Sequence, residues 1–193
     1  MAFLSAEVKK ALDRQAPKAV KPKFKQIAQK EFKKIKAEMI AEFLAHAVTR
    51  EIMDGPSAIN ISGTLGGVSN LFAFIGFDAG ENPIAPILSL LENTNLEFKD
   101  EVKGKEIGVG FTATLPTPEE VFAITPLPWA TGRSWARGIE QGISGLGHLL
   151  RKNEGRSGAA IQSRVKVRGG KFHNTPYISA FLKKYKKRFE ELK

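Results

Sequence analysis

Residues 26–53 carry an apolar stripe at helical spacing, which constrains the fold more than any other feature of the chain. Its members are Ala28, Phe32, Ile35, Met39 and Phe43. This spacing predicts one amphipathic helix, ended by Gly55-Pro56. A helix of about 28 residues spans roughly 40 Å, at about 1.5 Å per residue. Because this exceeds the core of a small domain, we expect part of the helix to pack on a neighbouring molecule.

The segment before this helix predicts a basic N-terminal arm over residues 1–25. Residues 3–15 have the spacing of a short amphipathic helix. Pro17 and Pro22 then lie among lysines, a composition typical of an extended linker. We expect the arm to become ordered only against a partner, and residues 26–193 to form a single domain.

The middle of the chain predicts short strands and helices. We expect strands at Asn60–Ser62 and Leu71–Phe77, a helix at Pro83–Asn93, and a hairpin of Leu96–Lys99 with Glu106–Leu115. Thr117-Pro118-Glu119-Glu120 has the hydroxyl, proline and carboxylate that begin a short helix.

A second long helix is predicted over Thr131–Lys152, with Trp135 and Ile139 on its apolar stripe. Gly138, Gly142 and Gly145 run beside that stripe. Each glycine inside a helix costs about 1 kcal/mol relative to alanine, so we interpret these three as a bare face for close approach of another backbone.

The last part of the chain is basic. Residues 161–168 alternate as a strand would, which places Arg164, Lys166 and Arg168 on one face. Thr175-Pro176 is expected to cap a C-terminal helix whose polar side includes Lys183 and Lys187. The predicted fold class is therefore α+β: a small, mostly antiparallel sheet crossed by a helix, with long N-terminal and short C-terminal basic helices.

Charge is segregated along the 193 residues of the chain. Residues 1–50 hold 12 basic and 5 acidic residues, residues 51–131 hold 3 and 11, and residues 132–193 hold 15 and 4. Such asymmetry indicates contacts with macromolecules, either nucleic acid or acidic protein surfaces. Two solvated basic helices beside an acidic middle region would give the same pattern, so charge alone does not specify the partner.

Motifs for chemistry are missing from the sequence. There is no cysteine, no phosphate-binding loop and no nucleophile elbow, and His46, His148 and His173 share no ligand spacing. We therefore predict a protein that is not an enzyme and has no cofactor or metal. Neither a signal peptide nor a membrane span is expected.

Three stretches of the chain carry a family resemblance: NLFAFIGF at 70–77, GRSWARGIEQGISGLGHLLR at 132–151 and NTPYISAFLKKYKKRF at 174–189. They resemble neck and tail-completion proteins, the head–tail connectors of tailed bacteriophages. The resemblance covers roughly residues 26–190 and lies in the pattern of elements, without a diagnostic motif. It implies a structural protein of the virion that forms a ring joining the portal or capsid to the tail.

The partners that this resemblance implies are identical subunits, portal or adaptor proteins and tail proteins, with DNA passing through the ring without sequence-specific binding. Candidate contact residues are Lys33, Lys34, Gly138, Gly142, Gly145, Arg164, Lys166, Arg168, Lys183 and Lys187. The alternative is a basic accessory protein that binds nucleic acid, for instance structured RNA. Under that alternative, Arg164, Lys166 and Arg168 would follow phosphates.

Overall fold

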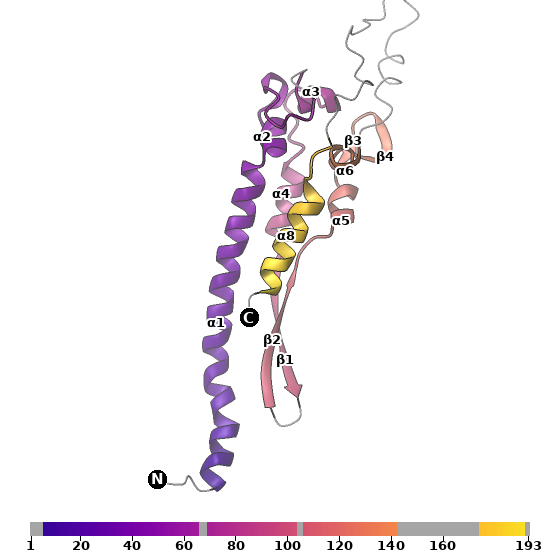
Figure 1. Ribbon diagram of the computed structural model, residues 1–193. Helices are drawn as coiled ribbons and strands as arrows, with labels where there is room; N and C mark the ends of the chain where they lie inside the picture. Colours follow the sequence, from indigo (N-terminus) through magenta and orange to yellow (C-terminus); the bar gives the residue numbers. More distant parts are fainter. Residues whose placement is uncertain (1–5, 66–68, 104–105, 143–173, 192–193) are drawn as a thin grey trace, which may run out of the picture.

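The computed structural model describes residues 6–65, 69–103, 106–142 and 174–191. They form an elongated molecule of helices and short antiparallel strands (Figure 1), which confirms the predicted α+β class. The elements are α1 (Ala6–Ala45), α2 (Ala47–Met53), a 3₁₀ turn (Gly55–Ser57), α3 (Leu71–Ile75), α4 (Ala85–Glu92), β1 (Asn95–Lys103), β2 (Glu106–Thr114), α5 (Pro118–Ala123), β3 (Pro126–Leu127), β4 (Ala130–Ser134), α6 (Trp135–Gln141) and α8 (Ile178–Glu190).

Helix α1 is continuous through residues 16–25, so the predicted extended linker is wrong. A proline removes one N–H donor from the hydrogen-bond ladder of a helix. The residues around Pro17 and Pro22 are mostly alanine, lysine and glutamine, which have high helix propensity. The ladder therefore continues on both sides of each proline.

The predicted helix over 26–53 is present, but His46 divides it. His46 is extended (φ −61°, ψ 134°), and its Nδ1 accepts a hydrogen bond of 3.3 Å from the amide of Val48, which caps α2. The predicted end at Gly55-Pro56 is confirmed, because α2 stops at Met53.

The strand predicted at Leu71–Phe77 is wrong, because this segment forms α3. The Asn70 side chain accepts from the amide of Ala73 and begins the helix, and Gly76 ends it with φ 87°. Leu71, Phe72 and Ile75 are buried around this short helix, so its apolar residues show no single stripe. Asn60–Ser62, also predicted as a strand, lies in irregular chain.

The helix expected at Pro83–Asn93 is confirmed as α4, and the expected hairpin as β1–β2. Phe98 pairs with Phe111 in its antiparallel register. A second two-stranded ladder joins β3 and β4, so the strands form two separate sheets within the described part of the chain.

The capping box predicted at Thr117 is confirmed: its hydroxyl accepts from the amide of Glu120, whose carboxylate accepts from the amide of Thr117. The long helix predicted over Thr131–Lys152 is wrong at its start, where β4 comes first. It is also wrong at Gly142, where α6 ends. Residues 143–173, including the predicted strand at 161–168, lie outside the described residues.

The apolar stripe of α8 is confirmed, because Ile178, Phe181, Leu182, Tyr185 and Phe189 are all buried. The expected cap at Thr175-Pro176 is wrong. Instead, the carboxylate of Glu140 in α6 accepts from the amide and the hydroxyl of Ser179, both at 2.6 Å. This non-local contact fixes where α8 begins.

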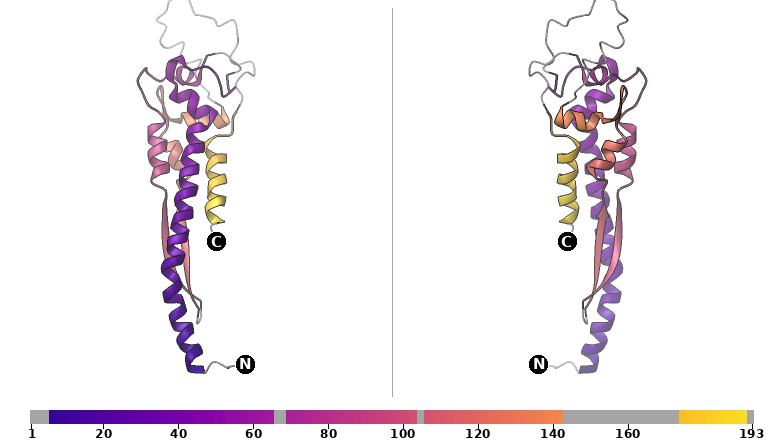
Figure 2. Two further views of the ribbon diagram at one scale, coloured as in Figure 1. Left: turned by 90° about the vertical axis from the view of Figure 1, so that its left-hand side faces the viewer. Right: turned by 90° about the vertical axis from the view of Figure 1, so that its right-hand side faces the viewer.

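One apolar core joins the second half of α1 to most of the other elements. Met39 and Phe43 of α1, Ile87 of α4 and Trp135 of α6 are almost fully buried in it. Helices α4 and α8 lie on opposite flanks of α1 at a similar level along the long axis (Figure 2). The first half of α1 and the hairpin project together from this core.

Candidate interaction surfaces

Helices α1 and α8 run antiparallel, and a ladder of charged hydrogen bonds joins them. Lys184 donates to Glu42 at 2.6 Å, and Arg188 donates to Glu38 at 2.5 Å. Since both pairs of residues are four apart, successive turns of one helix meet successive turns of the other. Two of the five cations on α8 are therefore used within the chain.

Tyr185 lies inside this ladder and couples it to the core. Its hydroxyl donates to Glu42 at 2.7 Å, and its ring packs on Phe181 at 5.0 Å between centroids. Hydrogen bonds from Lys184 and then Tyr185 hold the pKa of Glu42 below its usual value. Burial, followed by the bond to Glu42, raises the pKa of Tyr185 to about 12. Glu42 is therefore a carboxylate and Tyr185 a neutral donor at neutral pH.

The other three cations of α8 are exposed. We call them the basic flank: Lys183, Lys186 and Lys187. Lys187 lies 3.8 Å from Glu191 on its own helix, an exposed pair of little energy. No described residue forms an ion pair with Lys183 or Lys186. The candidates Lys183 and Lys187 thus belong to one available surface.

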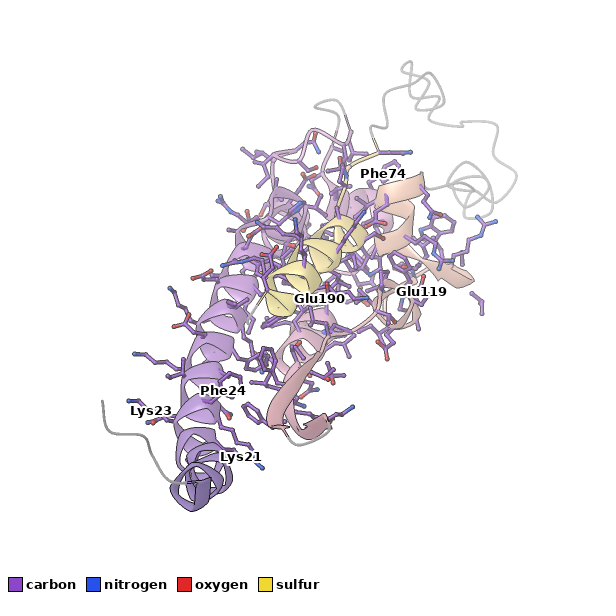
Figure 3. All side chains as sticks on the ribbon, turned by 60° about the horizontal axis from the view of Figure 1, so that its bottom comes forward. Lys21, Lys23, Phe24, Phe74, Glu119 and Glu190 are labelled. Atoms are coloured by element: carbon purple, nitrogen blue, oxygen red, sulfur yellow. The ribbon has the colours of Figure 1, made fainter. Side chains whose placement is uncertain are left out.

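The outward side of α1 is a second basic surface, which we call the α1 outer face. Its exposed cations are Lys23, Lys30, Lys33 and Lys34. Figure 3 shows Lys23 on the side of α1 away from the hairpin and Phe24 on the side that faces it. Seven residues make about two turns of a helix, so Lys30 lies on the same side as Lys23, and Lys33 and Lys34 are its neighbours one turn on. The candidates Lys33 and Lys34 thus lie on a different helix from the basic flank.

An acidic surface lies on α4 and on the loop that leads into it. Residues 51–98 contain no lysine or arginine. Within this stretch, Asp78, Glu81 and Glu92 are exposed, and we call them the acidic flank. Glu81 also accepts from the amide of Asp78 at 3.0 Å, which fixes the loop.

The contacts of α1 place the two flanks on different sides of the helix. Lys36 donates to the carbonyls of Glu92 and Thr94 at the end of α4, the latter at 2.9 Å. Glu38, two residues further along, binds Arg188 of α8. Two residues correspond to about 200° around a helix, so Lys36 and Glu38 point in nearly opposite directions. This agrees with the opposite positions of α4 and α8 in Figure 2.

The projecting end is held by few described side-chain contacts. Phe24 of α1 packs on Phe111 of β2 with ring centroids 6.3 Å apart, and Lys25 lies over the ring of Phe98 at 5.3 Å. A two-stranded hairpin is marginally stable by itself.

At the other end, a buried carboxylate holds the loop that follows α2. Glu51 accepts from Leu71 and Ser62 amides at 2.7 and 2.9 Å and from the Asn60 side chain at 2.8 Å. Ile59 and Ile61 in the same loop are 76% and 39% exposed. The buried bonds thus fix a loop that presents apolar side chains to solvent.

The candidate glycines Gly138 and Gly142 do not share a helix face. Gly138 is buried within α6, whereas Gly142 ends the helix with φ 99°. A Cβ at Gly142 would be 3.7 Å from Asn174, an ordinary contact, so its backbone conformation requires glycine and close approach does not. The interpretation as a bare helix face is wrong for Gly142. Gly145, Arg164, Lys166 and Arg168 lie outside the described residues.

Sequence reasoning missed the acidic partners, Glu38, Glu42 and Glu51. The four-residue spacing of Glu38 and Glu42 matches that of Lys184 and Arg188, which was a usable signal for an antiparallel ladder. Glu51 gave no such signal, because its donors come from irregular chain.

The described residues contain no group of three or more histidine, cysteine, aspartate or glutamate side chains placed to hold a metal ion. None of the described helices is both long and apolar enough to cross a membrane. Comparisons with family models, with curated proteins and with solved structures found no match.

Proposed function

We propose that this chain is a non-enzymatic structural protein of a tailed-phage virion. It acts as a ring subunit at the head–tail junction, as a neck, connector or tail-completion protein. Its partners are identical subunits, the portal or adaptor, and the tail. The sequence resemblance in 70–77, 132–151 and 174–189 suggested this role.

The observation that carries the proposal is the projection of α1 and the β1–β2 hairpin beyond the core. Helix α1 has 40 residues and each hairpin strand has nine. Phe24 with Phe111 and Lys25 with Phe98 are contacts that join them. An element that extends past its own core gains stability when another molecule covers it. Junction proteins need such surfaces in order to contact a neighbour, the head and the tail at once.

The α1 outer face and the exposed loop with Ile59 and Ile61 give further contact surfaces. The former is basic and the latter apolar, so they suit partners of different chemistry. We assign Lys33 and Lys34 to contacts with the portal or the tail.

Assembly of virions tests this proposal. Removing the protein from infection by the phage that encodes it should leave filled heads and finished tails unjoined in electron micrographs. Adding purified protein to these extracts should join them. Particles that assemble normally without the protein would contradict the proposed function.

Nucleic-acid binding is the second candidate, and the α1 outer face favours it. Four exposed lysines along one side of a helix can follow a phosphate backbone. Under this alternative, Lys30→Gln/Lys33→Gln/Lys34→Gln should flatten the salt dependence of binding by about 3 counterions. Lys183→Gln/Lys186→Gln/Lys187→Gln, with the same charge change elsewhere, is the matched control. We expect only weak binding to DNA or RNA at physiological salt.

A further inference from the structure

We propose that copies of this chain dock side by side, with the basic flank of one copy on the acidic flank of the next. The inference rests on the proposed ring and specifies its subunit contact. The basic flank is Lys183, Lys186 and Lys187 on α8. The acidic flank is Asp78, Glu81 and Glu92 on α4 and its preceding loop.

Among the described residues, no ion pair involves the side chains of Asp78, Glu81 or Glu92, nor those of Lys183 or Lys186. The basic flank has only the weak pair of Lys187 with Glu191, while Lys184 and Arg188 are already used by α1. The acidic flank belongs to a stretch, 51–98, without any lysine or arginine. Because opposite charges on two different surfaces complement one another, a second copy satisfies both flanks at once.

The positions of the flanks suit a repeated contact. Helices α4 and α8 lie on opposite sides of α1 and at a similar level along the long axis (Figure 2). A contact between two different surfaces of identical subunits is heterologous, and it generates a ring when the rotation between copies closes. Since α4 and α8 are at a similar level, neighbouring copies stand beside each other with their long axes alongside.

A second copy explains more of the surface than a nucleic acid does. Phosphates would neutralise the basic flank but would be repelled by the acidic flank of the same molecule. The copy-to-copy contact uses both flanks, and it leaves the α1 outer face and the projecting hairpin free for other partners.

Two charge-reversed variants test the contact. Lys183→Glu/Lys186→Glu reverses the basic flank, and Asp78→Lys/Glu92→Lys reverses the acidic flank. All four side chains are exposed, so the core is untouched. Glu81 is kept because it binds the amide of Asp78. The matched control is Lys30→Glu/Lys34→Glu, which makes the same charge change on the α1 outer face.

Sedimentation velocity and native mass spectrometry at about 50 mM and about 0.5 M salt give the readout, because salt screens exposed charges. Wild-type protein should associate at the lower salt and less at the higher. Each flank variant alone should associate about tenfold more weakly or worse, since like charges then face each other. The control should stay within about twofold of wild type.

The mixture of the two flank variants is the decisive sample. One variant has two acidic flanks and the other two basic flanks, so opposite charges face each other at every contact of an alternating mixture. Association of the mixture to within about threefold of wild type supports the inference. Net charge cannot produce this recovery, because both variants remain positive overall.

Three results of the association experiments would overturn the proposed contact. They are a wild type that stays monomeric at low salt, flank variants that associate like wild type, and a mixture that does not recover. Tight binding of DNA or RNA at physiological salt, abolished by Lys183→Glu/Lys186→Glu while self-association is unchanged, would also overturn it. Recovery in the mixture, with heads and tails that join normally without the protein, would keep the contact and reject the virion function.

Discussion

The two ends of α1 lie in very different surroundings. From Phe32 to Ala45 the helix is packed by α4 and α8 and fixed by the Glu38 and Glu42 ladder. From Ala6 to Lys25 it runs beside one hairpin, held by contacts such as Phe24 with Phe111. The second half of the helix is therefore stabilised by tertiary packing in the core, whereas the described contacts of the first half are with the hairpin. The two halves of α1 thus differ in what they pack against, an apolar core in one case and a two-stranded hairpin in the other.

The largest expected contrast comes from removing one aromatic ring at each end. Phe43 is 1% exposed and packs on the rings of Tyr177 and Phe181, so Phe43→Ala should cost about 3–5 kcal/mol of unfolding free energy. Phe111 is only half-buried, and Phe111→Ala should cost about 1 kcal/mol. Guanidinium denaturation followed by circular dichroism measures both losses. Equal losses would mean that the hairpin belongs to the core.

A second contrast concerns the buried carboxylate behind the exposed loop. Glu51→Ala leaves three donors without their acceptor, including the amide of the buried Leu71, and should cost about 2–3 kcal/mol. The exposed neighbour Asp54 is the control, since Asp54→Ala should stay within about 0.5 kcal/mol. Denaturant unfolding decides between them, and a Glu51→Ala protein as stable as the control would contradict the proposed anchoring role.

The ladder between α1 and α8 should lose a smaller amount. Glu42 is 42% exposed, so Glu42→Gln should cost only about 1 kcal/mol at neutral pH. The pKa of Glu42 is lowered in the folded protein from 4.5, the ordinary value. Its contribution is therefore complete above about pH 5 and is lost as the pH falls through the lowered pKa. Unfolding free energies from pH 7 to pH 3 should converge for the two proteins; a constant difference would reject the ionic contribution.

The smallest effect is expected at the break between α1 and α2. Burial is the largest influence on the pKa of His46 and lowers it below 6.5. The charge of Glu42 and a hydrogen bond to the Pro176 carbonyl act in the opposite direction. Its stabilising effect is complete above pH 6.5 and is lost as the pH falls from there through the lowered pKa, because the unfolded state binds the proton more readily. Protonation of Nδ1 would also remove the cap on Val48.

His46→Asn keeps a capping acceptor and removes the titration. Between about pH 7 and pH 5, the unfolding free energy of this variant should change less than that of wild type. The two changes should differ by under about 1 kcal/mol. Denaturant unfolding at several pH values measures the difference in slope. Identical slopes in the two proteins would show that His46 contributes nothing to the pH dependence.

Sequence signals predicted the helices and strands whose formation depends on residues close together in the chain. The hydroxyl of Thr117 with Glu120 predicted the start of α5, and alternation predicted the hairpin. The second half of α1 followed from its stripe, because one side of that helix is buried. Helix α3 was mistaken for a strand, although Asn70 and Gly76 are good signals for its two ends.

The other features could not be predicted from local sequence. They depend on contacts between distant residues, or on a residue whose type is compatible with two backbone conformations. Glu140 caps α8 from 39 residues away, and no spacing in the sequence indicates that bond. A glycine at position 142 is compatible both with a bare helix face and with a helix end. Its φ of 99° shows that it ends α6. The exposed sides of α8 and α4 became comparable surfaces only after the fold placed them on opposite flanks of α1.

Hydrogen exchange along α1, in the monomer and in assembled particles, tests most directly whether the projecting end is covered by other molecules. In the monomer, amides of residues 6–25 and of the hairpin should exchange at least about tenfold faster than those of residues 36–45, because local openings there break few contacts. In assembled particles these same amides should become protected. Protection of residues 6–25 equal to that of the core in a demonstrated monomer, or fast exchange that persists after assembly, would contradict an end built for partners.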